Sequence, residues 1–109
     1  PRMIGLTLEF KTQLKQFVHI SRSPAFYAER MHVSVAYLNE AVRKTTGVSA
    51  TRNIRNEIVI RAKRMLAHSR TDIQEIAREL GFEDCAYFSR LFSSVTHVSP
   101  SEFRKRYPE

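Results

Sequence analysis

Apolar residues recur at helical spacing along most of the chain. The first apolar stripe has members at i, i+4, i+7 and i+8, and this spacing predicts a helix over 7–20. Its members are Phe10, Leu14, Phe17 and Val18. No stretch alternates apolar and polar residues for long enough to predict a strand. The pattern therefore predicts an all-α fold.

Capping residues, prolines and glycines divide the rest of the chain into six further helices. Ser, Thr or Asp is expected at an N-cap, Pro at the first helical position and Gly just beyond a helix end. The helices predicted in this way cover 24–31, 34–46, 50–68, 73–80, 84–96 and a segment that starts at Ser99-Pro100 and ends before Pro108. Two N-caps stay open: Ser49 or Thr51 for helix 50–68, and Thr71 or Asp72 for helix 73–80.

One short pattern occurs twice in the chain. The two copies cover 28–50 and 77–100. The offset is 49 positions from Ala28 to Ala77 and 50 positions from Tyr37 to Tyr87. One extra residue therefore lies between these points, where a turn is expected. Two short helices joined by a tight turn form a helix-turn-helix unit, which this sequence predicts twice.

Each copy carries three features that such a unit needs. A small residue lets the helices approach, a residue that tolerates positive φ makes the turn, and an apolar residue packs the turn on the core. These residues are Ala28, His32 and Val33 in the first copy and Ala77, Gly81 and Phe82 in the second. On the second helix of the second copy, the expected buried residues are Tyr87, Phe88, Leu91 and Phe92.

The chain is basic. Lys and Arg number 18 against 11 Asp and Glu, which gives a net charge of +7 and suits a polyanionic partner. The simpler alternative is a charge that only keeps the protein soluble. Helix 50–68 carries five cationic side chains: Arg52, Arg55, Arg61, Lys63 and Arg64. The simplest interpretation is that they form a solvent-exposed face, of which a minority contact phosphates. Two helix-turn-helix units on a basic chain predict binding to double-stranded DNA.

Other classes of function are not expected. No apolar run approaches the roughly 20 residues that span a bilayer. Cys85 is the single cysteine, so no disulfide framework forms and a cytoplasmic setting is expected. The histidines have no metal-ligand spacing. No nucleophile–base pair or phosphate-binding glycine loop is present, so we expect neither an enzyme nor a cofactor or metal.

Several segments resemble the signature of AraC/XylS-type transcription regulators. They include Ile73-Gln74-Glu75-Ile76-Ala77, Leu80-Gly81-Phe82-Glu83-Asp84, Tyr87-Phe88-Ser89-Arg90-Leu91-Phe92 and Ser99-Pro100-Ser101-Glu102-Phe103-Arg104. The upstream residues 62–66 also fit, and the resemblance covers about residues 24–107. The motif is long and has fixed spacing, so chance is a poor explanation.

The resemblance implies one DNA-binding domain over 1–109 with seven helices. Subdomains 7–48 and 70–107 would each hold a helix-turn-helix unit, and a linker helix at 49–69 would join them. The recognition helices, about 34–46 and 84–96, would enter successive major grooves. These grooves repeat at about 34 Å, and a helix of about 19 residues is about 28 Å long. Adjacent grooves are therefore within reach of one chain.

The function implied is sequence-specific binding of double-stranded DNA by a bacterial transcription regulator that works in the cytoplasm at the nucleoid. Activator is the expected class, and the sequence leaves repressor open. The isolated domain is expected to be a monomer, with no membrane or small-molecule ligand. RNA polymerase is a second candidate partner. The competing hypothesis is a helical protein-interaction module that docks RNA polymerase or a partner domain, with no measurable affinity for duplex DNA.

Position by position, the resemblance places nine residues toward the bases: Val35, Ala36, Asn39, Glu40 and Arg43 in the first unit, and Cys85, Ala86, Ser89 and Arg90 in the second. Asn39 is suited to adenine and Arg90 to guanine. Glu40 either accepts from cytosine N4 or repels phosphate. Cys85 is expected to be a small side chain fitted to the groove, with a redox switch as the weaker alternative.

The expected phosphate contacts are Ser34, Tyr37, Lys44, Arg52, Asp84, Tyr87 and Ser99. The chain departs from the family pattern at three places. His97 stands where the family has glycine, Ser93-Ser94 replaces a basic pair, and Ala50 replaces a proline. Losing the basic pair removes a phosphate contact. We therefore expect the two units to read different sequences with different strengths.

Overall fold

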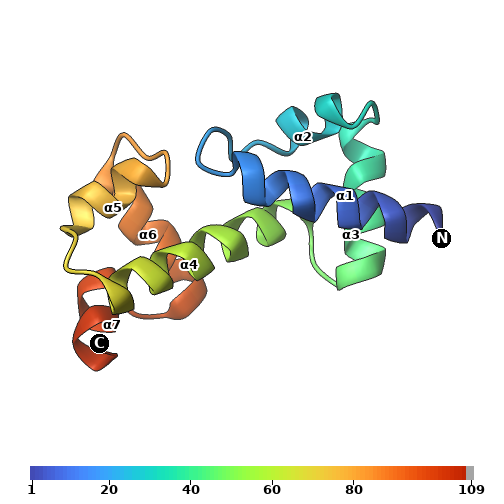
Figure 1. Ribbon diagram of the computed structural model, residues 1–109. Coiled ribbons are helices and arrows are strands. Elements are labelled where there is room, and N and C mark those ends of the chain that lie inside the picture. The colour runs from blue at the N-terminus through green and yellow to red at the C-terminus, as the bar shows by residue number, and fades with distance from the viewer. Residues whose placement is uncertain (108–109) are drawn as a thin grey trace. The chain divides into compact units, whose positions relative to one another are not determined.

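The structure is a computed structural model that describes residues 1–107, so Pro108 lies outside the described residues. All regular structure in this range is helical (Figure 1). The helices are α1 Arg2–Phe17, α2 Pro24–Arg30, α3 Val35–Thr46, α4 Ala50–His68, α5 Ile73–Glu79, α6 Cys85–Thr96 and α7 Pro100–Arg106. The predicted all-α fold with seven helices is confirmed for this part of the chain.

The chain folds as two compact units, Pro1–Ile54 and the segment from Arg55 onward, and the boundary falls inside α4. In the first unit α1 packs on α2 and α3. Its core holds the fully buried side chains of Phe10, Tyr27 and Leu38, and the Phe10 and Tyr27 rings meet edge to face with centroids 5.5 Å apart. This geometry is the favoured one for aromatic pairs.

Helix α1 differs from its predicted range of 7–20. It begins at Arg2, because the packed side continues toward the N-terminus through the buried Thr7 and the half-buried Leu6 and Met3, while Ile4 and Leu8 are more than half exposed. It ends at Phe17, where the amides of Ile20 and Ser21 both bond to the Phe17 carbonyl in a turn. Burial periodicity thus located the buried part of the helix and not its ends.

The second unit is organised around a run of aromatic side chains from α6 and its neighbours. Phe88 and Phe92 are fully buried, with Phe82 and Phe103 beside them at ring centroid distances of 5.3 Å and 5.7 Å. Arg104 of α7 donates from Nε to the carbonyl of Leu66 at 3.1 Å and from Nη2 to Ser69 at 3.3 Å. These bonds satisfy carbonyls at the end of α4.

The expected capping residues are found at the helix starts. Ser49 Oγ, and not Thr51, accepts the Arg52 amide at 3.1 Å. Asp72, and not Thr71, accepts the Gln74 amide. The helix ends use left-handed residues: Gly47 has φ +88° after α3 and His97 has φ +66° after α6. His97 therefore occupies the conformation for which the related family uses glycine.

Candidate nucleic-acid interface

The two predicted helix-turn-helix turns have the same backbone hydrogen bonds. In the first, the Val33 amide donates to the carbonyl of Ala28 at 3.0 Å; in the second, the Phe82 amide donates to Ala77 at 2.9 Å. The residue before each donor is left-handed, with φ +57° at His32 and φ +94° at Gly81. These are the bonds of a Schellman motif, which ends one helix and sets the direction of the next.

The apolar residues of the two turns are buried to different degrees. Phe82 is 3% exposed, as expected for a side chain that packs the turn on the core. Val33 is only half-buried, so the corresponding prediction holds less well in the first copy. The difference follows from side-chain size, since a phenyl ring reaches further into a core than an isopropyl group.

Helix α3 presents a sharply divided surface. Ser34 Oγ accepts the Tyr37 amide at 3.0 Å and fixes the start of the helix. Leu38, Ala41 and Val42 are fully buried on one side. On the other side are exposed members of the predicted base-facing set: Val35, Ala36, Glu40 and Arg43. Within the described part of the chain, Arg43 has no hydrogen-bond or ion-pair partner.

Asn39 has a structural role that the sequence did not predict. Its side chain is half-buried, and Oδ1 accepts the amide of Ala50, the first residue of α4, at 2.9 Å. A bidentate contact to adenine needs that same oxygen as an acceptor, but an amide oxygen has two lone pairs. Asn39 therefore holds the start of α4, and the adenine contact stays a prediction.

The same bond explains the departure at Ala50. Proline has no amide hydrogen, so a proline at this position could not donate to Asn39. In the second copy the equivalent residues, 50 positions later, are Ser89 and Pro100. Pro100 has no hydrogen to donate, and Ser89 has no hydrogen-bond partner among the described residues. The Ser89 hydroxyl is therefore available on the outer side of α6.

Glu40 is paired with Lys44 one turn later on α3. The Lys44 ammonium lies 3.6 Å from the Glu40 carboxylate, and both side chains are at least half exposed. Exposed pairs of this kind contribute about 0.2–1 kcal/mol. The pairing means that Lys44, an expected phosphate contact, must leave Glu40 to bind DNA. Both alternatives for Glu40 remain open.

Helix α6 is also divided, with one correction. Asp84 caps it by accepting the Ala86 amide at 2.9 Å, and Phe88, Leu91 and Phe92 face the core. Tyr87 was expected among these buried residues, but it is 48% exposed. Its position, about 100° around the helix from Phe88, places it at the edge of the buried stripe. Exposure suits its other predicted role, a phosphate contact.

The remaining α6 candidates lie outside the core. Ala86 and Arg90 are exposed, and Cys85 and Ser89 are half-buried. Cys85 is a free thiol. Asp84 was also an expected phosphate contact, but its carboxylate carries negative charge and no donor. The Asp84 carboxylate caps α6, so a phosphate contact at this residue would have to come from its backbone amide, and it stays a prediction.

The other phosphate candidates are mostly at helix starts. Ser34 and Ser99 accept amide hydrogens from Tyr37 and Glu102. Ser34 thereby keeps its own hydroxyl hydrogen for an outside acceptor, whereas Ser99 Oγ also lies 3.3 Å from Ser101 Oγ, with either hydroxyl able to donate. Tyr37 is half-buried, with the Arg2 guanidinium 5.6 Å from its ring centroid. Arg52 is exposed in the first turn of α4.

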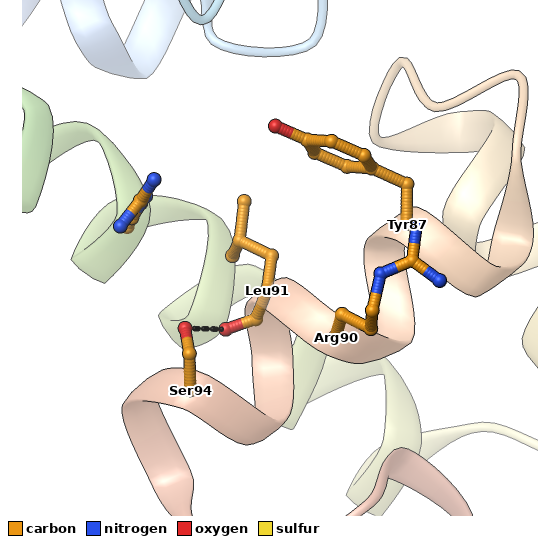
Figure 2. Close-up of a pocket in the computed structure, with 5 residues that line it drawn as sticks. Tyr87, Arg90, Leu91 and Ser94 are labelled. Carbon is orange, nitrogen blue, oxygen red and sulfur yellow. Dashed lines mark hydrogen bonds between the residues drawn. The ribbon is translucent and has the colours of Figure 1, made fainter.

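Sequence reasoning missed a pocket in the second unit. Arg55, Tyr87, Arg90, Leu91 and Ser94 line a depression of about 220 Å³ (Figure 2). It was missed because Arg55 lies on α4, where it was grouped with a solvated face. A signal was present: no carboxylate stands three or four positions before or after Arg55 or Arg90. Neither arginine therefore has the neighbour needed for an ion pair along its own helix.

Residues 1–107 offer neither a metal site nor a membrane-spanning helix. No group of three or more His, Cys, Asp and Glu side chains there could hold a metal ion. No helix in that range combines the length and apolar character that crossing a membrane requires.

Comparison with known proteins gives the family. A family described as a helix-turn-helix domain matches residues 27–106. The arabinose operon regulatory protein of Salmonella typhimurium is 35% identical over 80 residues, which cover 73% of this chain and 28% of that protein. The chain thus spans less than a third of the length of this curated relative.

Two solved structures share the fold. The C-terminal domain of AraT, a response regulator from Geobacillus stearothermophilus, has a TM-score of 0.88 at 22% identity, with 95% of this chain and 87% of that chain covered. The DNA-binding domain of AdpA, solved with a target DNA, has a TM-score of 0.83 at 22% identity, with 93% and 91% covered. The family match and the similarity to the curated relative agree with the duplicated turns. The chain therefore belongs to the AraC-type helix-turn-helix family.

Proposed function

We propose that this chain is the sequence-specific, double-stranded DNA-binding part of a transcription regulator. The observation that carries the proposal is the repeated Schellman turn, at Ala28–Val33 and at Ala77–Phe82, one in each compact unit. Each turn is followed by a helix with one buried and one outer side. A net charge of +7 supplies the general attraction to phosphate.

Base contacts are proposed for the outer sides of α3 and α6. On α3 the candidates are Val35, Ala36, Glu40 and Arg43, and on α6 they are Cys85, Ala86 and Ser89. Arg43 and Ser89 are the strongest, because neither has a partner among the described residues. Arginine pairs bidentately with guanine, and a serine hydroxyl can donate or accept at several base edges. Small neighbours let the helix approach the groove closely.

Selection of bound duplexes from a random-sequence pool tests the function. We expect two half-sites about one helical turn, about 10 base pairs, apart, one for each unit. A single half-site would show that one unit does not read bases, and equal affinity for all duplexes would overturn the proposed sequence specificity.

A module that only docks RNA polymerase is not favoured, because the matching family and the curated relative are helix-turn-helix proteins and a transcription regulator. Contact with polymerase in addition to DNA is compatible with the proposal, as is a monomeric state of this segment. Action on chromosomal DNA would place the protein in the cytoplasm. Native mass spectrometry of the segment with and without a selected duplex would measure how many copies bind.

A further inference from the structure

The pocket formed by Arg55, Tyr87, Arg90, Leu91 and Ser94 is not accounted for by base reading. It lies along one side of α6, and Arg55 of α4 completes it. We propose that this pocket holds the sugar–phosphate backbone of one DNA strand, with the Arg55 and Arg90 guanidinium groups on phosphate oxygens. The inference rests on the proposed function and specifies how its second unit holds the strand.

The absence of ion-pair partners at the two arginines supports this assignment. Three helix arginines are paired with carboxylates on their own helix: Arg61 with Glu57, Arg78 with Glu75 and Arg106 with Glu102. Neither Arg55 nor Arg90 has a carboxylate partner among the described residues. Arg90 has only the Tyr87 ring beside it, 5.9 Å from its guanidinium carbon. Both cations therefore bind an anion without first breaking an ion pair.

The pocket is lined by both cationic and apolar side chains. Figure 2 shows the side chain of Leu91 and the ring of Tyr87 together, with Arg90 beside the tyrosine. Ser94 Oγ donates to the Leu91 carbonyl at 2.7 Å, so the hydroxyl hydrogen is already used. An apolar centre with arginines suits a deoxyribose flanked by phosphates better than a small free anion.

The position of the pocket on α6 also favours backbone over base edge. At 100° per residue, Tyr87, Arg90, Leu91 and Ser94 form a stripe beside the one that carries Ala86 and Ser89. When a recognition helix lies in the major groove, its outer stripe faces the bases and its flanks face the strands that wall the groove. Arg90 stands on the flank, so this inference replaces the guanine contact expected from sequence.

The test compares Arg55→Gln and Arg90→Gln with a matched control, Arg64→Gln. Arg64 is exposed on α4, nine positions and therefore about 180° around the helix from Arg55, and it has no partner among the described residues. The probes are a duplex selected from a random pool and an unrelated duplex of equal length. Fluorescence anisotropy measures affinity at about 50 and about 200 mM salt.

Each phosphate contact that is lost lowers the salt slope by about 0.9, which makes the affinity loss between these salt concentrations about 3.5-fold smaller. We expect this change for Arg55→Gln and Arg90→Gln, with roughly tenfold weaker binding of both duplexes at low salt. Arg64→Gln should match the wild type, and Arg55→Lys should recover most of the affinity. Circular dichroism should show the same helix content in all variants.

Several results would overturn the inference. If the wild type binds duplex but Arg55→Gln has unchanged affinity and salt slope, the pocket does not bind the DNA backbone. The proposed function would not be affected by that result. A change of base preference in Arg90→Gln at one position would restore base reading. Loss of RNA polymerase binding alone would assign the pocket to an acidic protein surface. A wild type that binds no duplex would overturn both proposals.

Discussion

At the scale of single residues, the two copies place glycine and histidine at their left-handed positions in opposite order. Two positions in each copy need a left-handed backbone: the turn between the helices and the end of the recognition helix. The first copy uses His32 and then Gly47, whereas the second uses Gly81 and then His97. Non-glycine residues pay a conformational penalty at such positions, although histidine is among those that tolerate them best.

This exchange predicts opposite effects of two substitutions. His97→Gly should raise the free energy of unfolding by about 0.5–1 kcal/mol, because it relieves the left-handed penalty. Gly47→Ala should lower it by about 1 kcal/mol, and from conformation alone, because an added Cβ would meet nothing within 4 Å. Urea denaturation measures both. Equal effects of the same sign would contradict the expectation.

The bond between Asn39 and Ala50 predicts a coupled pair of substitutions. Asn39→Ala should cost about 1 kcal/mol, because it leaves the part-buried Ala50 amide without its acceptor. In an Ala50→Pro background there is no amide to satisfy, so the same substitution should cost less than half as much. A double-mutant cycle by chemical denaturation measures this coupling.

Ser89→Ala is the matched control for this cycle in the second copy. Ser89 and Pro100 are the equivalents of Asn39 and Ala50 by sequence offset, and no hydrogen bond joins them, so the change should stay within about 0.5 kcal/mol. Additive costs of Asn39→Ala and Ala50→Pro would show that the hydrogen bond does not determine the stability of this corner.

At the scale of elements, the sequence placed helices well where a cap or a left-handed residue marked the boundary. Ser34, Asp84 and Ser99 accept the amides expected of N-caps. It was less accurate where burial decides: α1 begins before the predicted helix, and Tyr87 lies outside the buried stripe of α6. Capping is a local property of neighbouring residues, whereas burial depends on elements far apart in the chain.

The candidate site shows the same limit. Composition and the repeated pattern predicted which helices face DNA, and most of the residues predicted on their outer sides are exposed. The bond from Asn39 to Ala50 joins two helices, and the pocket joins Arg55 of α4 to α6. Neither follows from the periodicity of one helix. Interactions between elements are therefore what the structure adds to the interface.

Helix α3 provides a prediction for its surface ion pair. Glu40→Gln frees Lys44 and removes a negative charge from the DNA-facing side, so both a selected and an unrelated duplex should bind several-fold more tightly with a steeper salt slope. Stability should fall by no more than about 0.5 kcal/mol. Lys44→Gln is the control and should weaken both complexes. If Glu40→Gln instead relaxes preference at one base pair, Glu40 reads cytosine.

At the scale of the whole molecule, the protein consists of two units with separate hydrophobic cores and one helix that passes from one to the other. Leu38 is fully buried in the first unit and Phe88 in the second. A unit with its own core can open without exposing the core of the other. Each unit can therefore have its own stability and its own affinity, as expected for two units that read different sequences.

Core truncations test this independence. Leu38→Ala should destabilise the first unit by about 2–5 kcal/mol, and Phe88→Ala the second by about 3–5 kcal/mol. In hydrogen-exchange mass spectrometry, Leu38→Ala should reduce protection in α1–α3 and leave α5–α7 close to wild type, and Phe88→Ala should do the reverse. Ile54 and Ile58, buried on either side of the boundary within α4, report where the two responses meet. Loss of protection throughout the chain in both variants would show one cooperative unit, and α4 would then couple the two DNA-reading helices in stability.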